Sequence, residues 1–255
     1  MPDATRNANQ SVYGRSRVVR RYVAEASLGL TEPEKFCLNL VPASSRGSIL
    51  DIGIGAGRTT GPLSVQFSKY IGIDYSAAMI KAAKRIYSDC DLRVMDARSL
   101  QFEPCSFDCV VFSYSGIDSV GYDDRHKIFR EIARVLNPGG YFIYSTKNIH
   151  YWKMPSWKDT FWHPAIFESW KSPIRCIPNR FRNFWKQSID PERGIAFINE
   201  QGAGFSLVNA YVDIPKELAI LEKYGLSAVD MIGRLKTTSG YDSDDEWVYI
   251  TLRKR

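Results

Sequence analysis

A glycine-rich turn that follows a short apolar stretch constrains this chain more than any other feature. Residues 48–60 read SILDIGIGAGRTT, in which an apolar run precedes Asp51 and glycines occupy alternate positions at Gly53, Gly55 and Gly57. A buried strand that ends in such a turn, with a helix beginning near Arg58, brings the backbone close to a ligand. The stretch therefore predicts a site for a nucleotide-like cofactor.

Apolar strands and amphipathic helices alternate around this turn. The expected strands cover 48–50, 70–73, 92–95, 109–113, 141–145, 205–212, 226–232 and 247–252, and the expected helices cover 16–27, 31–41, 77–87, 123–136 and 215–224, with one more from about residue 58. Near-continuous apolar strands separated by helices are typical of a parallel sheet covered on both faces. The last two strands are closely spaced, which predicts an antiparallel pair at the edge of the sheet.

Composition sets outer limits on function. The 255 residues suffice for one α/β domain with an insertion, and the net charge of +6 allows an anionic partner without requiring one. The five cysteines are scattered and form no CxxC pair, so we expect reduced thiols and no metal site. The N-terminus has no apolar signal-peptide core, and no run of 18 apolar residues occurs. A cytoplasmic location is therefore expected, and the oligomeric state stays open.

Three acids stand where an open parallel sheet binds its ligands. Asp51 lies on the first strand, while Asp74 and Asp96 end the second and third. An acid about twenty residues past a glycine turn is placed to accept hydrogen bonds from ribose hydroxyls. The glycines follow G-x-G-x-G rather than the dinucleotide pattern G-x-G-x-x-G, and no GK[ST] follows them. Asp51 suits a cofactor that carries an amino group and a sulfonium better than a pyrophosphate.

Four stretches in this order resemble the motifs of class I S-adenosylmethionine-dependent methyltransferases. They are ILDIGIGAGR, GIDYS, VMDARSLQFEPCSFDCVVFS and RVLNPGGYFIYS, all within residues 48–145. The resemblance implies a Rossmann-like, doubly wound and mostly parallel seven-stranded sheet with an antiparallel edge strand and an inserted helical lid. It also implies a single domain over 1–255, with an N-terminal helical cap at 1–46 and the lid at 147–204.

The resemblance further implies which residues bind S-adenosylmethionine. The glycine turn would approach the methionine part and the ribose, and Asp51 would help organise it near the amino group. Asp74 would accept from the ribose hydroxyls and Asp96 from the adenine amino group. The implied cofactor-binding residues are Asp51, Gly53, Ile54, Gly55, Gly57, Asp74, Tyr75, Met79, Asp96, Ala97, Ser113 and Tyr114. Two alternatives stay open: Asp51 as a turn cap and Met79 as a core residue.

The chemistry expected is transfer of the methyl group to O, N or C of an acceptor. Because a sulfonium is a good leaving group, alignment of the acceptor and exclusion of water dominate this reaction. A hydroxyl acceptor would need a base, and the candidates are His150 and Asp118. Tyr13 and Tyr22 are expected to approach the sulfonium through cation–π contacts.

Residues 151–186 interleave tryptophans and phenylalanines with lysines and arginines. Four interpretations stay open: a lid over a small-molecule or amphiphilic acceptor, peripheral membrane contact, packing on the core, and base stacking on RNA. Nucleic acid is favoured least, because the N-P-P-Y signature and a pair of motif cysteines are absent. The alternatives to a small-molecule enzyme are an RNA methyltransferase and a non-catalytic S-adenosylmethionine-binding partner protein.

Overall fold

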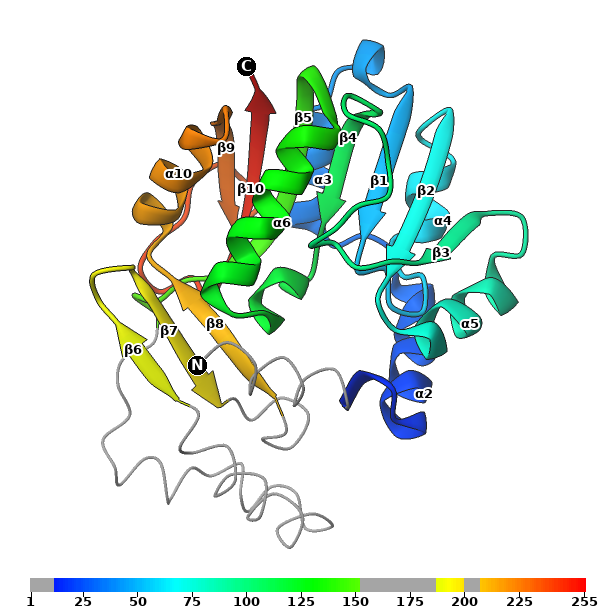
Figure 1. Ribbon diagram of the computed structural model, residues 1–255, viewed down its shortest axis with the longest axis horizontal. Coiled ribbons are helices and arrows are strands. Elements are labelled where there is room, and N and C mark those ends of the chain that lie inside the picture. The colour runs from blue at the N-terminus through cyan, green and yellow to red at the C-terminus, as the bar shows by residue number, and fades with distance from the viewer. Residues whose placement is uncertain (1–11, 152–186, 200–206) are drawn as a thin grey trace, which may run out of the picture.

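A computed structural model of the chain describes residues 12–151, 187–199 and 207–255. Its centre is a seven-stranded sheet in the order β3-β2-β1-β4-β5-β10-β9 (Figure 1). The strands are β1 (Ser48–Ile52), β2 (Lys69–Asp74), β3 (Asp91–Val94), β4 (Phe107–Phe112), β5 (Leu136–Lys147), β9 (Leu226–Gly233) and β10 (Trp247–Lys254). The first five run parallel, and β10 runs antiparallel to both β5 and β9. The predicted sheet and its antiparallel edge pair are confirmed, with β9 as the outer strand.

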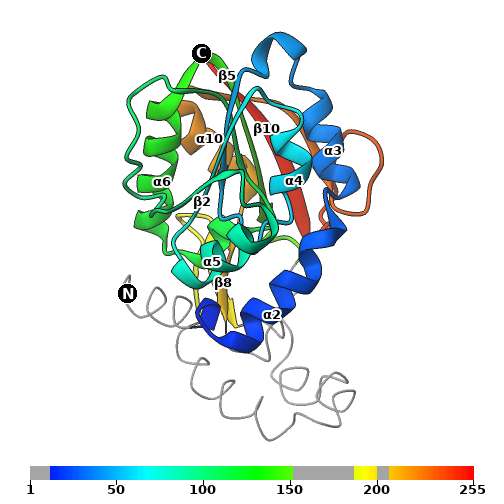
Figure 2. The ribbon, with the colours of Figure 1, turned by 90° about the vertical axis from the view of Figure 1, so that its right-hand side faces the viewer.

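Helices cover both faces of this sheet, as the doubly wound prediction requires (Figures 1 and 2). On one face lie α6 (Tyr122–Val135) and α10 (Ile214–Lys223), and on the other α3 (Glu32–Asn39), α4 (Thr60–Ser64) and α5 (Ala77–Ile86). Side chains of a strand alternate between the faces. Leu50 packs with the α6 face and Ile49 with the α3 face, both fully buried. The apolar runs in the sequence are therefore strands buried on both sides.

Helix α2 (Ser16–Glu25) crosses the end of the molecule at which the parallel strands finish (Figure 2). It contacts α5, and none of its residues is buried. No helix among the described residues has the length and apolarity needed to cross a bilayer.

A second sheet of three antiparallel strands lies beyond the carboxyl end of β5 (Figure 1). Its strands are β6 (Ser188–Asp190), β7 (Ile195–Asn199) and β8 (Val208–Val212). The strand predicted at 205–212 is present over Val208–Val212 but pairs in this second sheet. Val212 also forms an isolated bridge with Asn148, which directly follows β5. Strands β6 and β7 were not predicted, because each is short and their apolar residues show no clear alternation. Most of the helical lid predicted at 147–204 lies outside the described residues, namely 152–186 and 200–204.

Candidate functional site

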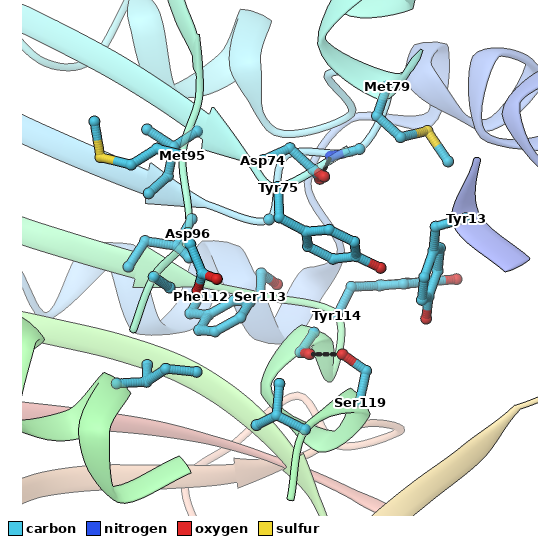
Figure 3. Close-up of a pocket in the computed structure, with 18 of the residues that line it drawn as sticks. Tyr13, Asp74, Tyr75, Met79, Met95, Asp96, Phe112, Ser113, Tyr114 and Ser119 are labelled. Carbon is cyan, nitrogen blue, oxygen red and sulfur yellow. Dashed lines mark hydrogen bonds between the residues drawn. The ribbon is translucent and has the colours of Figure 1, made fainter. Parts of the chain in front are cut away.

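A pocket opens at the carboxyl ends of β1, β2 and β4, where the ligand-binding crevice of an open α/β sheet is expected (Figure 3). Its empty space measures about 820 Å³ when the part open to solvent is included. Of the predicted cofactor residues, those that line it are Gly53, Gly55, Asp74, Tyr75, Met79, Asp96, Ala97, Ser113 and Tyr114. Asp51 and Ile54 line a smaller cavity that shares Gly53, Ser113 and Tyr114 with it. Gly57 lines neither cavity.

The glycine turn holds a backbone conformation that other residues rarely adopt. Gly53 and Gly55 have φ values of +70° and +55°. A Cβ atom on Gly55 would lie 2.8 Å from the Tyr22 ring of α2. The Gly55 N–H donates to Asp74 Oδ2 at 2.9 Å. The turn therefore needs glycine both for its conformation and for the close approach of the N-terminal helix.

We expect Gly55→Ala to lower the free energy of unfolding by about 1–2 kcal/mol, because an L side chain in the left-handed region is strained. The same Cβ would push Tyr22 and α2 away from the turn. Chemical denaturation measures the loss. Gly14→Ala is the matched control, since a Cβ there has no heavy atom within 4 Å. Equal stability of the two variants would contradict this account of the turn.

Asp74 links the end of β2 to the turn. Its two carboxylate oxygens accept from the backbone N–H groups of Gly55 and Ser76, at 2.9 and 2.8 Å. Burial raises the pKa of Asp74 to about 6, although both hydrogen bonds favour the charged form. Each oxygen keeps a lone pair free for a ligand.

Asp51 lies behind the turn and is fully surrounded. It accepts from the Thr59 hydroxyl at 2.6 Å and from the Tyr70 hydroxyl at 2.8 Å. Burial raises the pKa of Asp51 to about 7. The contact with Thr59, which precedes α4, is what a turn cap would make, so this open alternative keeps structural support beside the cofactor role.

Asp96 follows β3 and faces the pocket (Figure 3). The Arg98 guanidinium donates to both Asp96 oxygens and, at 2.7 Å, to Asp124 at the start of α6. These bonds fix the direction of the Asp96 carboxylate.

A buried network around Glu34 supports the other side of the pocket. The sequence marks Glu34 only as part of a helix-capping box with Thr31, and its carboxylate does accept from the Thr31 N–H at 2.6 Å. It also binds both terminal nitrogens of Arg58, at 2.8 and 2.5 Å, and the Ser113 hydroxyl. The Arg58 guanidinium stacks over the Tyr114 ring at 4.7 Å. In the sequence, the signal for an acidic partner is Arg58 itself, a cation next to the glycines and apolar residues of 52–57.

The backbone after β4 is strained where it borders the pocket. Tyr114 and Ser115 both adopt the left-handed region, with φ values of +57° and +55°. The Ser115 N–H donates to Ser145 Oγ on β5 at 2.7 Å, which holds this turn in place. Non-glycine residues with a positive φ are uncommon, and those that occur are concentrated at functional sites.

Three tyrosines form an aromatic wall on one side of the pocket. The ring of Tyr13 meets those of Tyr22 and Tyr75 edge to face, with both centroid distances 6.1 Å. Burial raises the pKa of Tyr22 to about 12 and that of Tyr13 well above its usual value. These phenols are therefore neutral, and their rings are available for contact with a cation, as predicted for Tyr13 and Tyr22.

Neither predicted base lines the pocket. Asp118 is buried beneath the site, where it accepts from Arg125 at 2.8 Å and from Thr146 at 2.7 Å. Burial raises its pKa to about 6. The side chain of His150 is 57% exposed, with Nε2 3.6 Å from Asp213 Oδ2. The contacts of Asp118 thus favour a structural role, and a base role for either residue stays an untested prediction.

Within the described part of the chain, no three His, Cys, Asp or Glu side chains gather in a way that could hold a metal ion.

Comparison with known proteins agrees with this architecture. A family described as "Methyltransferase domain" matches residues 49–140. A demethylmenaquinone methyltransferase of Renibacterium salmoninarum is 30% identical over 46% of this chain and 48% of its own length. A fatty-acid O-methyltransferase of Mycolicibacterium smegmatis is 31% identical over 53% and 47%. The chain thus spans about half the length of the curated relatives it matches.

Solved structures share the fold at low identity. The N-methyltransferase NodS of Bradyrhizobium japonicum, in complex with S-adenosylhomocysteine, aligns over 99% of both chains with a TM-score of 0.56 and 14% identity. Residues 49–140 match a methyltransferase domain, and the sheet built around them has the fold of class I S-adenosylmethionine-dependent methyltransferases.

Proposed function

We propose that this protein transfers a methyl group from S-adenosylmethionine to O, N or C of a small-molecule or lipid-like acceptor. The observation that carries the proposal is the pocket lined by both the glycine turn and Asp74, at the carboxyl ends of the parallel strands. The proposal includes a single domain over residues 1–255, with 1–46 as its cap and 147–204 covering the acceptor side.

The residues present fit the cofactor in two connected cavities. In the larger one, the free lone pairs of Asp74 would accept from the ribose hydroxyls, and Asp96 would accept from the adenine amino group beside Met79 and Ala97. The smaller cavity is lined by Glu25, Asp51 and Arg58, which offer both signs of charge. This pairing suits the amino and carboxylate groups of the methionine part.

The bound cofactor would supply an electrophilic methyl group, and the protein would orient the acceptor and exclude water. The tyrosine wall and the strained turn at Tyr114 are suited to that task. No histidine or lysine lines the pocket among the described residues. An acceptor that is already nucleophilic, such as a carboxylate, an amine or a stabilised carbanion, needs no such base.

The relatives favour a lipid-like acceptor. One is named for demethylmenaquinone and the other for a fatty acid, both largely apolar molecules with a reactive polar end. Incubation of the protein with S-adenosylmethionine and a naphthoquinol, a fatty acid or RNA would separate the acceptor classes through formation of S-adenosylhomocysteine. Turnover on RNA alone would refute the proposed acceptor class. Cofactor binding without turnover on any acceptor would favour the partner-protein alternative.

We expect Asp74→Ala to weaken S-adenosylmethionine binding by about 10- to 150-fold, because a hydrogen bond to a charged group contributes about 1.5–3 kcal/mol. Isothermal titration calorimetry measures the dissociation constant. Asp123→Ala, a loss of an exposed acid in the first turn of α6, is the matched control. Wild-type affinity in the Asp74 variant would rule out the proposed cofactor site.

A further inference from the structure

Positive charge is concentrated on the two helices beside the pocket. Helix α2 carries three arginines and one glutamate, a charge of +2, and α5 carries two lysines and one arginine without an acid, a charge of +3. Together they hold +5, close to the net charge of +6 of the whole chain. The two helices contact each other at the same end of the molecule (Figures 1 and 2). We call the exposed basic residues of the two helices the α2–α5 surface: Arg17, Arg20, Arg21, Lys81, Lys84 and Arg85.

Most of these cations are free of acidic partners. Five exposed residues of the α2–α5 surface form no ion pair with any described residue: Arg17, Arg20, Lys81, Lys84 and Arg85. On α2, only Arg21 is paired, with Glu25 at 2.8 Å. Asp91 interacts electrostatically with Lys84, but its ion pair is with Arg93, at 2.6 Å. Among the described residues, no acid forms an ion pair with these five cations.

Exposed aliphatic side chains accompany the cations. Val23 on α2, Leu28 just after it and Ile86 on α5 are 41%, 70% and 46% exposed. Basic residues next to exposed aliphatic ones are typical of helices that lie at a membrane surface. Surfaces that bind single-stranded RNA stack bases on aromatic rings, and no exposed aromatic side chain lies on the described parts of α2 or α5. The composition therefore favours lipid over nucleic acid.

The same two helices form part of the pocket. Tyr22 of α2 and Met79 of α5 line it. A lipid surface bound by these helices would lie next to the pocket that they help to form. We propose that the α2–α5 surface docks the protein on anionic phospholipid, so that a lipid-like acceptor passes from the bilayer to the pocket. The acceptor half of this inference rests on the proposed function, and the docking half stands on charge and exposure alone.

The test is co-sedimentation of the full chain with vesicles of phosphatidylcholine, with and without phosphatidylserine. We expect binding to the anionic vesicles that falls with added salt. Replacing Arg17 and Arg20 by glutamine should lower the partition coefficient about 30-fold. Replacing Arg130 and Lys223 by glutamine is the matched control, because these exposed cations lie on α6 and α10, over the other face of the sheet. The control should bind as the wild type does.

Equal binding by the two double variants, or no binding to anionic vesicles, would overturn the docking surface. Preferential capture of single-stranded RNA over vesicles, lost in the Arg17 and Arg20 variant, would overturn it in favour of nucleic acid. Calorimetry with S-adenosylmethionine separates the two proposals. Neither arginine lines the pocket, so cofactor affinity should stay unchanged in both variants. Absence of cofactor binding with intact vesicle binding would refute the methyltransferase and not the docking surface.

Discussion

Replacing Arg125 by methionine is expected to lower the free energy of unfolding by about 3–5 kcal/mol, because it leaves two buried acids without a cation. The Arg125 side chain is 2% exposed. It donates to Asp118 at 2.8 Å, to Glu217 at 2.5 Å and to Thr146 at 2.7 Å. This cluster ties α6 to α10 and to the carboxyl end of β5. Chemical denaturation at neutral pH measures the loss.

The control is the triple variant Asp118→Asn, Arg125→Met and Glu217→Gln. It removes all three charges, so most of the lost stability should return. The single variant should also recover as the pH falls. Without Arg125, the buried Asp118 binds a proton in the folded state more readily than in the unfolded chain, so stability decreases with rising pH. A single variant as stable as the wild type, or no rescue in the triple variant, would contradict a charge cluster that stabilises the fold.

Replacing Asp51 by asparagine is expected to raise the free energy of unfolding at pH 8 by up to about 4 kcal/mol. Burial raises the pKa of Asp51 to about 7, so the ionised carboxylate destabilises the folded state. The folded wild type binds a proton more tightly than the unfolded chain does. Its stability should therefore increase as the pH falls from about 7 to about 4, and the asparagine variant should lose that slope. Thermal and chemical denaturation across this range check both statements.

The gain in stability should come with a loss of cofactor affinity. Asparagine still accepts from Thr59 and Tyr70 but offers no charge to an amino group in the cavity that Arg58 also lines. Asp123→Asn serves as the matched control, because it removes an exposed acid. If Asp51→Asn were less stable than the wild type at pH 8 while its pH slope stayed unchanged, burial of a charged Asp51 would be refuted. Unchanged cofactor affinity would leave Asp51 as a turn cap.

The sheet and the cofactor side of the site could be predicted because their signals are local. Apolar runs separated by amphipathic helices specify strands buried on both faces, and parallel strands must end at one edge. The sequence therefore predicts that the acids and glycines at the ends of β1 and β2 lie close together. Asp74 bonding to Gly55 is the direct outcome of that rule.

The acceptor side could not be predicted in the same way. Asp118 and His150 come after strands, as Asp74 comes at the end of one. Asp118, however, is buried against Arg125, and His150 is exposed beside Asp213. Strand β8 was expected from its apolar residues, but its partners β6 and β7 lie in a stretch without clear periodicity. Which strand pairs with which, and which acid faces a cation, depends on residues distant in the chain.

The sequence by itself determined the strands and helices of the main sheet, the glycine turn and the acids at the strand ends, because periodicity and backbone sterics act within a few residues. Only the tertiary structure decided which buried charges meet. Ser113 binds Glu34 across 79 positions of the chain, and Arg125 binds Glu217 across 92. No pattern within either segment specifies such a partner, since a buried charge is satisfied by whichever opposite charge the packing of the helices brings to it.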